Sequence, residues 1–205
     1  MKLRNISILV GALLLVDQAL KVVIKTTMRI GESIIVFPDW FQLRFVENNG
    51  AAFGMQIASG GAFDWGKMAL SGFRVCMICA LGYYICHLVK QKAPKGVIVA
   101  MAMVFAGAVG NMIDSAIYGL IFSESTPYTV AEFGAGGYAD FMMGRVVDMF
   151  YFPLFQWNGV PKFLSFLVDS NNYFFGAIFN LADSYISVAV VYLLLFQWRY
   201  FNTEE

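Results

Sequence analysis

The chain has 205 residues, of which 59% are apolar, 17% aromatic and only 14% charged, and its formal net charge is zero. A soluble domain carries about 25% charged residues, so this composition indicates a protein whose surface faces lipid. A zero net charge gives no support for a nucleic-acid partner, and the length predicts one integral membrane domain over residues 1–205 with no room for a large soluble one.

Four apolar stretches are long enough to cross a bilayer, which takes about 20 mostly apolar residues. The predicted transmembrane helices cover about 6–25, 67–89, 96–122 and 174–200. The first stretch has no small-residue cleavage site after it, so we interpret it as an uncleaved helix and not as a removed signal peptide. The expected fold class is an all-α membrane protein with four transmembrane helices.

Basic residues predict the orientation of these helices. Lys and Arg are enriched in short cytoplasmic loops. They lie at helix ends that would all face the same side of the membrane: Lys2, Arg4, Lys90, Lys92, Lys95 and Arg199. Both termini are therefore expected in the cytoplasm, and two longer loops, about 26–66 and 123–173, are expected on the outer face.

The two outer loops carry different patterns. Residues 41–45 alternate between apolar and polar, which is typical of a half-buried strand, and residues 34–37 form a second strand candidate across a turn at 38–39. A small extracytoplasmic β-sheet is therefore expected. The second, longer loop contains an aromatic run at 149–157, a composition that favours the lipid headgroup level. This run either anchors the loop or contacts a lipid-linked substrate.

Charged residues within the apolar runs carry most of the functional information, because a carboxylate at the bilayer centre costs about 2.5–3.5 kcal/mol on insertion scales. Asp17 and Lys21 lie four positions apart in the first helix, and the acid precedes the base. That order favours an ion pair on one helix face. We expect this pair to have a structural role.

A second group of polar residues suggests a shared site. Asn111 and Asp114 share a helix face, Asn180 and Asp183 repeat the spacing, and Asp148 lies among large apolar residues. Two carboxyls in close contact share a proton, so one can activate water while the other polarises a carbonyl group. Buried carboxylates also serve proton- or ion-coupled transporters, and Asn and Asp side chains can simply hold helices together in a scaffold. The spacing alone leaves these alternatives open.

Five segments together resemble the lipoprotein signal peptidases, also called signal peptidase II. They occur in the same order along nearly the whole chain. The segments are 17–21 (DQALK), 48–54 (NNGAAFG), 110–114 (GNMID), 146–148 (VVD) and 179–184 (FNLADS).

The resemblance implies an aspartic endopeptidase in the bacterial inner membrane, with Asp148 and Asp183 as its catalytic pair and no metal or other cofactor. The implied substrate is a prolipoprotein with a diacylglyceryl-modified cysteine, cut just before that cysteine, and membrane lipid and globomycin-type inhibitors are the other implied partners. The implied dyad-supporting or substrate-binding residues are Asn48, Gly50, Asn111, Asp114 and Asn180, and the implied structural residues are Asp17 and Lys21.

Two departures from the family pattern affect these expectations. The family usually has Arg directly after the position of Asp114, whereas this chain has Ser115. A hydroxyl cannot replace a guanidinium in a charge role, and Arg145, close before Asp148, is the candidate for the missing charge. The stretches on both sides of Asp148 are also longer than usual, which surface loops tolerate at small cost.

Overall fold

The structure is a computed structural model that describes residues 1–38, 40–49, 65–161, 164–165, 168 and 172–202. Helix α1 covers Leu3–Thr27 and α2 covers Trp65–Lys90. Helix α3, Lys95–Ile113, continues through a π-helical turn, η2, at Asp114–Tyr118 into the short α4 at Gly119–Ile121. Near the C-terminus, α5 covers Leu181–Phe196 and α6 covers Trp198–Asn202.

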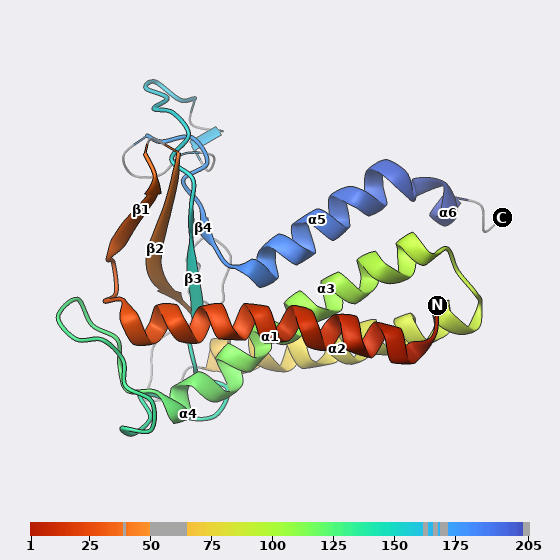
Figure 1. The fold of residues 1–205 in the computed structure, drawn as a ribbon, viewed down its shortest axis with the longest axis horizontal. Helices are drawn as coiled ribbons and strands as arrows, with labels where there is room; N and C mark the ends of the chain where they lie inside the picture. Colours follow the sequence, from red (N-terminus) through yellow and green to blue (C-terminus); the bar gives the residue numbers. More distant parts are fainter. Residues whose placement is uncertain (39, 50–64, 162–163, 166–167, 169–171, 203–205) are drawn as a thin grey trace.

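The long helices form a bundle with α3 at its centre. Helices α1, α2 and α5 all pack against α3, and in Figure 1 the chain termini and the α2–α3 connection lie at the same end of the molecule. The β-sheet stands across the opposite end. We refer to these as the terminal end and the sheet end.

Three of the four predicted transmembrane helices are confirmed. Three helices, at 3–27, 66–90 and 95–121, are long and apolar enough to cross a membrane, whereas the apolar helix Leu181–Phe196 is shorter. The predicted fourth helix, 174–200, is wrong at its beginning, because residues 178–179 belong to a strand and the helix starts only at Leu181.

Four antiparallel strands form one sheet in the order β1-β2-β3-β4. They are β1, Ser33–Phe37, β2, Phe41–Asn48, β3, Val146–Tyr151, and β4, Ile178–Phe179. The first two confirm the predicted hairpin, although Asp39 of its turn lies outside the described residues. Strands β3 and β4 were not predicted. The expected fold class, an all-α protein with a small sheet, is therefore too narrow. Strand β3 comes from the second predicted loop, and β4 comes from the stretch predicted as the start of the fourth helix.

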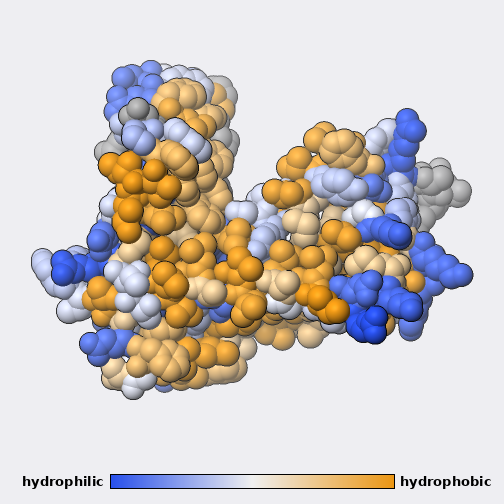
Figure 2. All heavy atoms as spheres, viewed as in Figure 1, coloured by the Kyte–Doolittle hydropathy of each residue, from blue (hydrophilic) through white to orange (hydrophobic). Residues whose placement is uncertain are grey.

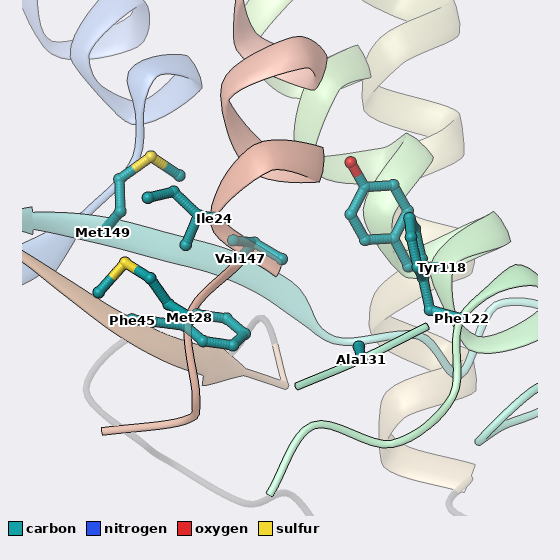
Figure 3. Close-up of a cluster of buried hydrophobic side chains, with 8 residues drawn as sticks. All are labelled: Ile24, Met28, Phe45, Tyr118, Phe122, Ala131, Val147 and Met149. Carbon is teal, nitrogen blue, oxygen red and sulfur yellow. The ribbon is translucent and has the colours of Figure 1, made fainter. Parts of the chain in front are cut away.

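A buried apolar cluster joins the sheet to the helices (Figure 3). Ile24 and Met28, from the last turn of α1 and the residue after it, pack against side chains of β2, β3, η2 and the loop that follows α4. The other members are Phe45, Tyr118, Phe122, Ala131, Val147 and Met149. Val147 and Met149 are the neighbours of Asp148 in β3. Because side chains alternate along a strand, they point to the face opposite to that of Asp148. The cluster therefore fixes which way Asp148 points.

The bundle surface is apolar, as expected for contact with lipid. Leu15 on α1, Tyr83 on α2 and Leu194 on α5 are 72%, 75% and 66% exposed. Figure 2 shows hydrophobic residues over the middle of the molecule and hydrophilic residues gathered at the terminal end and at the far tip of the sheet end. This distribution is typical of a protein embedded in a bilayer with both ends in water.

Candidate active site

Asp148 and Asp183 approach each other from different elements at the sheet end. Asp148 lies in the middle of β3 and is only 4% exposed, whereas Asp183 lies partly exposed in the first turn of α5. One side chain connects them. The amide nitrogen Nδ2 of Asn180 donates to Oδ1 of Asp148 at 2.7 Å, and Oδ1 of Asn180 accepts from the backbone N–H of Asp183 at 3.0 Å.

The start of α5 explains why Asn180 and Asp183 meet. Asn180 is the N-cap of this helix, and Oδ2 of Asp183 accepts in return from the backbone N–H of Asn180 at 3.3 Å, which completes a capping box. A capping box satisfies two backbone N–H groups that have no partner at a helix start. The same contacts place the Asp183 carboxylate at the positive end of the helix dipole, where negative charge is stabilised.

Asn111 on α3 closes a ring of polar side chains. Its Nδ2 donates to Oδ1 of Asp183 at 2.8 Å, and its Oδ1 accepts from Nδ2 of Asn180 at 3.1 Å. Asn180 thus contacts both members of the pair, whereas Asn111 contacts Asp183 directly and reaches Asp148 through Asn180. The structure therefore brings together Asn111, Asp148, Asn180 and Asp183, which lie far apart in the sequence except for the last two.

Burial first and the nearby carboxyl of Asp183 second raise the pKa of Asp148 to about 7, although the hydrogen bonds from Asn180 and Asn48 oppose part of the increase. The Asn48 contact is the weaker of the two, with Nδ2 at 3.4 Å from Oδ2. A carboxyl with such a pKa holds its proton near neutral pH. The pair thus combines one buried carboxyl that is an acid with one more exposed carboxyl next to a helix N-terminus.

A buried ion cluster around Lys21 supports both carboxyls. Lys21 is fully buried, and its Nζ lies 3.1 Å from Oδ2 of Asp17, 2.7 Å from Oδ2 of Asp114 and 2.8 Å from Oδ1 of Asn111. Asp17 accepts from the backbone N–H of Ala182 at 2.9 Å. Asp114 accepts from the backbone N–H of Val147 at 3.3 Å.

Each carboxylate of this cluster therefore holds the residue just before one member of the pair. Ala182 precedes Asp183, and Val147 precedes Asp148. Lys21 forms an ion pair with each carboxylate, and this attraction offsets part of the cost of burying them. The sequence predicted an ion pair between Asp17 and Lys21; it did not indicate that Lys21 also contacts Asp114 or that the cluster reaches both strand and helix.

The π-helical turn η2 begins at Asp114, and its backbone makes room for a close crossing by the loop before β3. The carbonyl oxygen of Ser115 accepts from the N–H of Gly144 at 2.8 Å. A Cβ at Gly144 would lie 2.3 Å from the carbonyl oxygen of Asp114, so only glycine fits here. Single π-helical turns are frequent at functional sites, and this one joins α3 to the strand that carries Asp148.

Helices α3 and α5 also approach closely. A Cβ added at Gly107 would lie 2.4 Å from the carbonyl oxygen of Ala182, and one at Gly110 would lie 3.4 Å from the Cβ of Ala182. Small residues let membrane helices come into backbone contact. Here the contact is one turn from the hydrogen bond between Asn111 and Asp183.

Arg145 lies away from the carboxyl pair, contrary to its predicted placement. Its two terminal nitrogens lie 3.2 Å from Glu47 and 3.2 Å from Glu124. Glu47 pairs with Val147 in the ladder and also forms an ion pair with the buried Lys25. Because Val147 and Asp148 point to opposite faces, Arg145 belongs to the opposite face of the sheet.

Two polar residues at the site had no predicted role. Gln18 donates from Nε2 to Asp114 at 2.9 Å and to Asp17 at 3.1 Å; its position beside Asp17 was the available signal. Arg74 on α2 donates from Nη1 to the hydroxyl of Ser115 at 3.4 Å, and a lone cation inside an apolar run was the signal there. Gly50, predicted near the substrate, lies outside the described residues.

Comparisons with known proteins agree with this arrangement. The family model for signal peptidase (SPase) II matches residues 9–199. The lipoprotein signal peptidase of Porphyromonas gingivalis is 42% identical over 193 residues, covering 93% of this chain and 81% of that protein. The lipoprotein signal peptidase of Amoebophilus asiaticus is 30% identical over 188 residues, covering 88% and 72%.

Two solved structures described as bacterial membrane enzymes have a similar fold. Their TM-scores are 0.63 and 0.60 at 23% and 25% sequence identity, and the matches cover 98% and 93% of this chain and 92% and 90% of those chains. The family match extends over nearly the whole chain, including all the residues of the polar ring. The chain is a bacterial multi-pass membrane enzyme and belongs to the signal peptidase II family, the aspartic peptidases that remove signal peptides from prolipoproteins.

Proposed function

We propose that Asp148 and Asp183 are the catalytic dyad and that they cut a prolipoprotein just before its diacylglyceryl-modified cysteine. The observation that carries this proposal is the ring of hydrogen bonds through Asn180 and Asn111, which joins one buried carboxyl to one partly exposed carboxyl. Asp148 is the member that keeps a proton near neutral pH, since its pKa is raised to about 7 by burial and by Asp183. Asp183 is the member that acts as the base, because its carboxylate lies at the N-terminus of α5, where negative charge is stabilised.

The reaction then follows from these two roles, with Asp148 as the acid and Asp183 as the base. Asp183 removes a proton from a water molecule, whose oxygen attacks the scissile carbonyl carbon, while Asp148 gives its proton to the carbonyl oxygen. The resulting gem-diol collapses when Asp183 returns its proton to the leaving nitrogen and Asp148 takes back the proton from a hydroxyl. One water is consumed, and the products are a new carboxyl terminus on the signal peptide and a free amine on the lipidated cysteine.

The depth of the dyad supports a lipid-anchored substrate. Both carboxyls lie at the sheet end, away from the basic terminal end that the distribution of Lys and Arg assigns to the cytoplasm. A cysteine carrying two acyl chains is held at the membrane surface, so the bond before it reaches this level. Water also reaches it, which removes the need for a channel. The site then belongs at the outer face of the inner membrane, with both termini in the cytoplasm.

The test is cleavage of a diacylglyceryl-modified peptide by purified enzyme in detergent, with globomycin as the expected inhibitor. Asp148→Asn and Asp183→Asn should each lower kcat by at least about 100-fold, since general acid–base catalysis contributes about 10²–10⁴-fold. Asp140→Asn is the matched control, because Asp140 is exposed and away from the ring. Substantial turnover by either dyad variant would remove that residue from the catalytic pair.

A further inference from the structure

Arg74 belongs to a polar stripe on α2 that faces the site. Lys67, Ser71 and Arg74 lie four and three positions apart, so they share one helix face. Lys67 donates to the carbonyl oxygen of Met143 at 2.8 Å, and Ser71 donates to that of Met142 at 3.2 Å. These contacts turn the stripe toward the segment that leads into β3.

The Arg74 guanidinium is the member of the stripe that lies nearest to the polar ring. It donates to the hydroxyl of Ser115, the residue after Asp114, at 3.4 Å. That hydroxyl in turn donates to the carbonyl oxygen of Asn111, a member of the ring, at 3.2 Å. The ion-pair partner of Asp114 is the ammonium group of Lys21 at 2.7 Å, so Arg74 is not needed as its contact partner.

The position of Arg74 within the bilayer calls for a functional reason. It lies about 14 Å along the helix axis from Trp65, at about 1.5 Å per residue, inside the candidate span 66–90. Ionisable side chains at such depth are rare and usually mark a functional site. Half-buried at the bundle interior, Arg74 carries five N–H donors and no acceptor.

The substrate needs donors at this point. Its signal-peptide helix has to unwind around the scissile bond, and the freed carbonyl groups on the bilayer side of that bond find no partner in lipid. Asn180 is not free to serve them, because both N–H groups of its amide are used, one by Asp148 and one by Asn111. A guanidinium beside the dyad offers several N–H groups in a fixed plane.

We propose that Arg74 is a substrate-binding residue: its guanidinium donates hydrogen bonds to backbone carbonyl groups of the substrate segment unwound at the dyad. This inference rests on the proposed function of Asp148 and Asp183. Ser115 orients the guanidinium beside Asn111, one side chain away from Asp183.

The experiment measures binding separately from chemistry. In an Asp148→Asn background, the Kd for an uncleaved diacylglyceryl-modified peptide is compared with and without Arg74→Gln. Loss of a charge-assisted hydrogen bond should weaken binding roughly 10- to 100-fold, and Arg74→Lys should recover much of it. In the active enzyme, Arg74→Gln should raise KM more than it lowers kcat. Arg29→Gln is the control, because Arg29 is an exposed arginine at the same end of the molecule.

The outcomes separate this inference from the dyad assignment. Equal Kd values with and without Arg74→Gln, in an Asp148→Asn protein that does not cleave, would overturn the role of Arg74 alone. Cleavage by the Asp148→Asn protein would instead overturn the dyad. If Arg74 only bridged α2 to η2, Ser115→Ala would weaken substrate binding and thermal stability as much as Arg74→Gln does, and that result would also overturn the inference.

Discussion

At the scale of single residues, the burial of Asp148 makes the stability of the fold depend on pH. Its pKa lies near 7 in the folded protein, against an ordinary value of 3.8, so the folded state binds this proton more tightly than the unfolded state. The resulting stabilisation is complete below about pH 4 and is lost as the pH rises through about 7. Three pKa units correspond to about 4 kcal/mol at most.

Asp148→Asn should therefore be more stable than the unmodified enzyme above pH 7, while the two should unfold alike near pH 4, because Asn resembles the protonated acid. The measurement is thermal unfolding in detergent at pH 4.5 and pH 8. In the unmodified enzyme, cleavage should also decline as the pH rises past about 7, since the dyad then loses the proton that the carbonyl oxygen receives. Unfolding temperatures that differ by the same amount at both pH values would contradict this account of Asp148.

At the residue scale, the acids and asparagines selected from the sequence come together in the structure, whereas Arg145 lies elsewhere and Arg74 was not selected. The polar residues of the ring stand out because each is costly within an apolar run. Arg145 was selected because it lies close to Asp148 in the sequence. Side chains alternate along the strand, however, so Arg145 lies on the face opposite to that of Asp148. Arg74 meets Ser115 across 41 positions and two helices, a pairing that no local pattern encodes.

At the scale of elements, the approach of α3 to α5 sets the geometry of the dyad. Gly107 lets the backbone of α5 come so near that a Cβ there would lie 2.4 Å from a carbonyl oxygen. The hydrogen bond from Asn111 to Asp183, at 2.8 Å, spans the same helix pair one turn away. Any separation of the two helices at Gly107 lengthens this bond.

Gly107→Ala should lower kcat by at least about tenfold, because displacements of about 1 Å at a catalytic site can cost about 100-fold, while the protein still inserts and folds. Cleavage kinetics and the detergent elution profile provide the check. Gly11→Ala on α1 is the control, since a Cβ there meets nothing within 4 Å and alanine favours the helix. Full activity in Gly107→Ala would show that the dyad does not depend on this helix contact.

The start of α5 shows where element prediction from hydropathy ends. Apolar residues predominate from residue 174 onward on both sides of Asn180, and a short apolar run does not distinguish a strand from a helix. The boundary is encoded in Asn180 and Asp183, which match a capping box. Their spacing of three was interpreted as one helix face, and the capping alternative would have placed the helix start correctly. Strand β3 was not predicted because its partner β2 lies far earlier in the sequence, and no local pattern indicates that pairing.

At the scale of the whole molecule, the short α5 sets the depth of the site. Its 16 residues span about 24 Å at 1.5 Å per residue, less than the hydrocarbon thickness of about 30 Å. If the end near Trp198 and Arg199 lies at the inner interface, the helix N-terminus lies several ångströms below the outer one. Asp183 then lies just inside the membrane, at the end of the molecule that carries the sheet.

This arrangement predicts which side of the membrane each end of the molecule faces. The native cysteines, Cys76, Cys79 and Cys86, are free and exposed on α2, so they are first replaced by alanine. Tyr128→Cys, at a residue that is 85% exposed in the loop after α4, should react in intact cells or spheroplasts with a maleimide that does not cross the membrane. Lys92→Cys, in the exposed connection between α2 and α3, should react only after the membrane is permeabilised.

The opposite result, labelling of Lys92→Cys in sealed cells with protection of Tyr128→Cys, would show the inverted topology. The dyad would then lie at the cytoplasmic face, where a lipid-modified precursor anchored in the outer leaflet could not reach it.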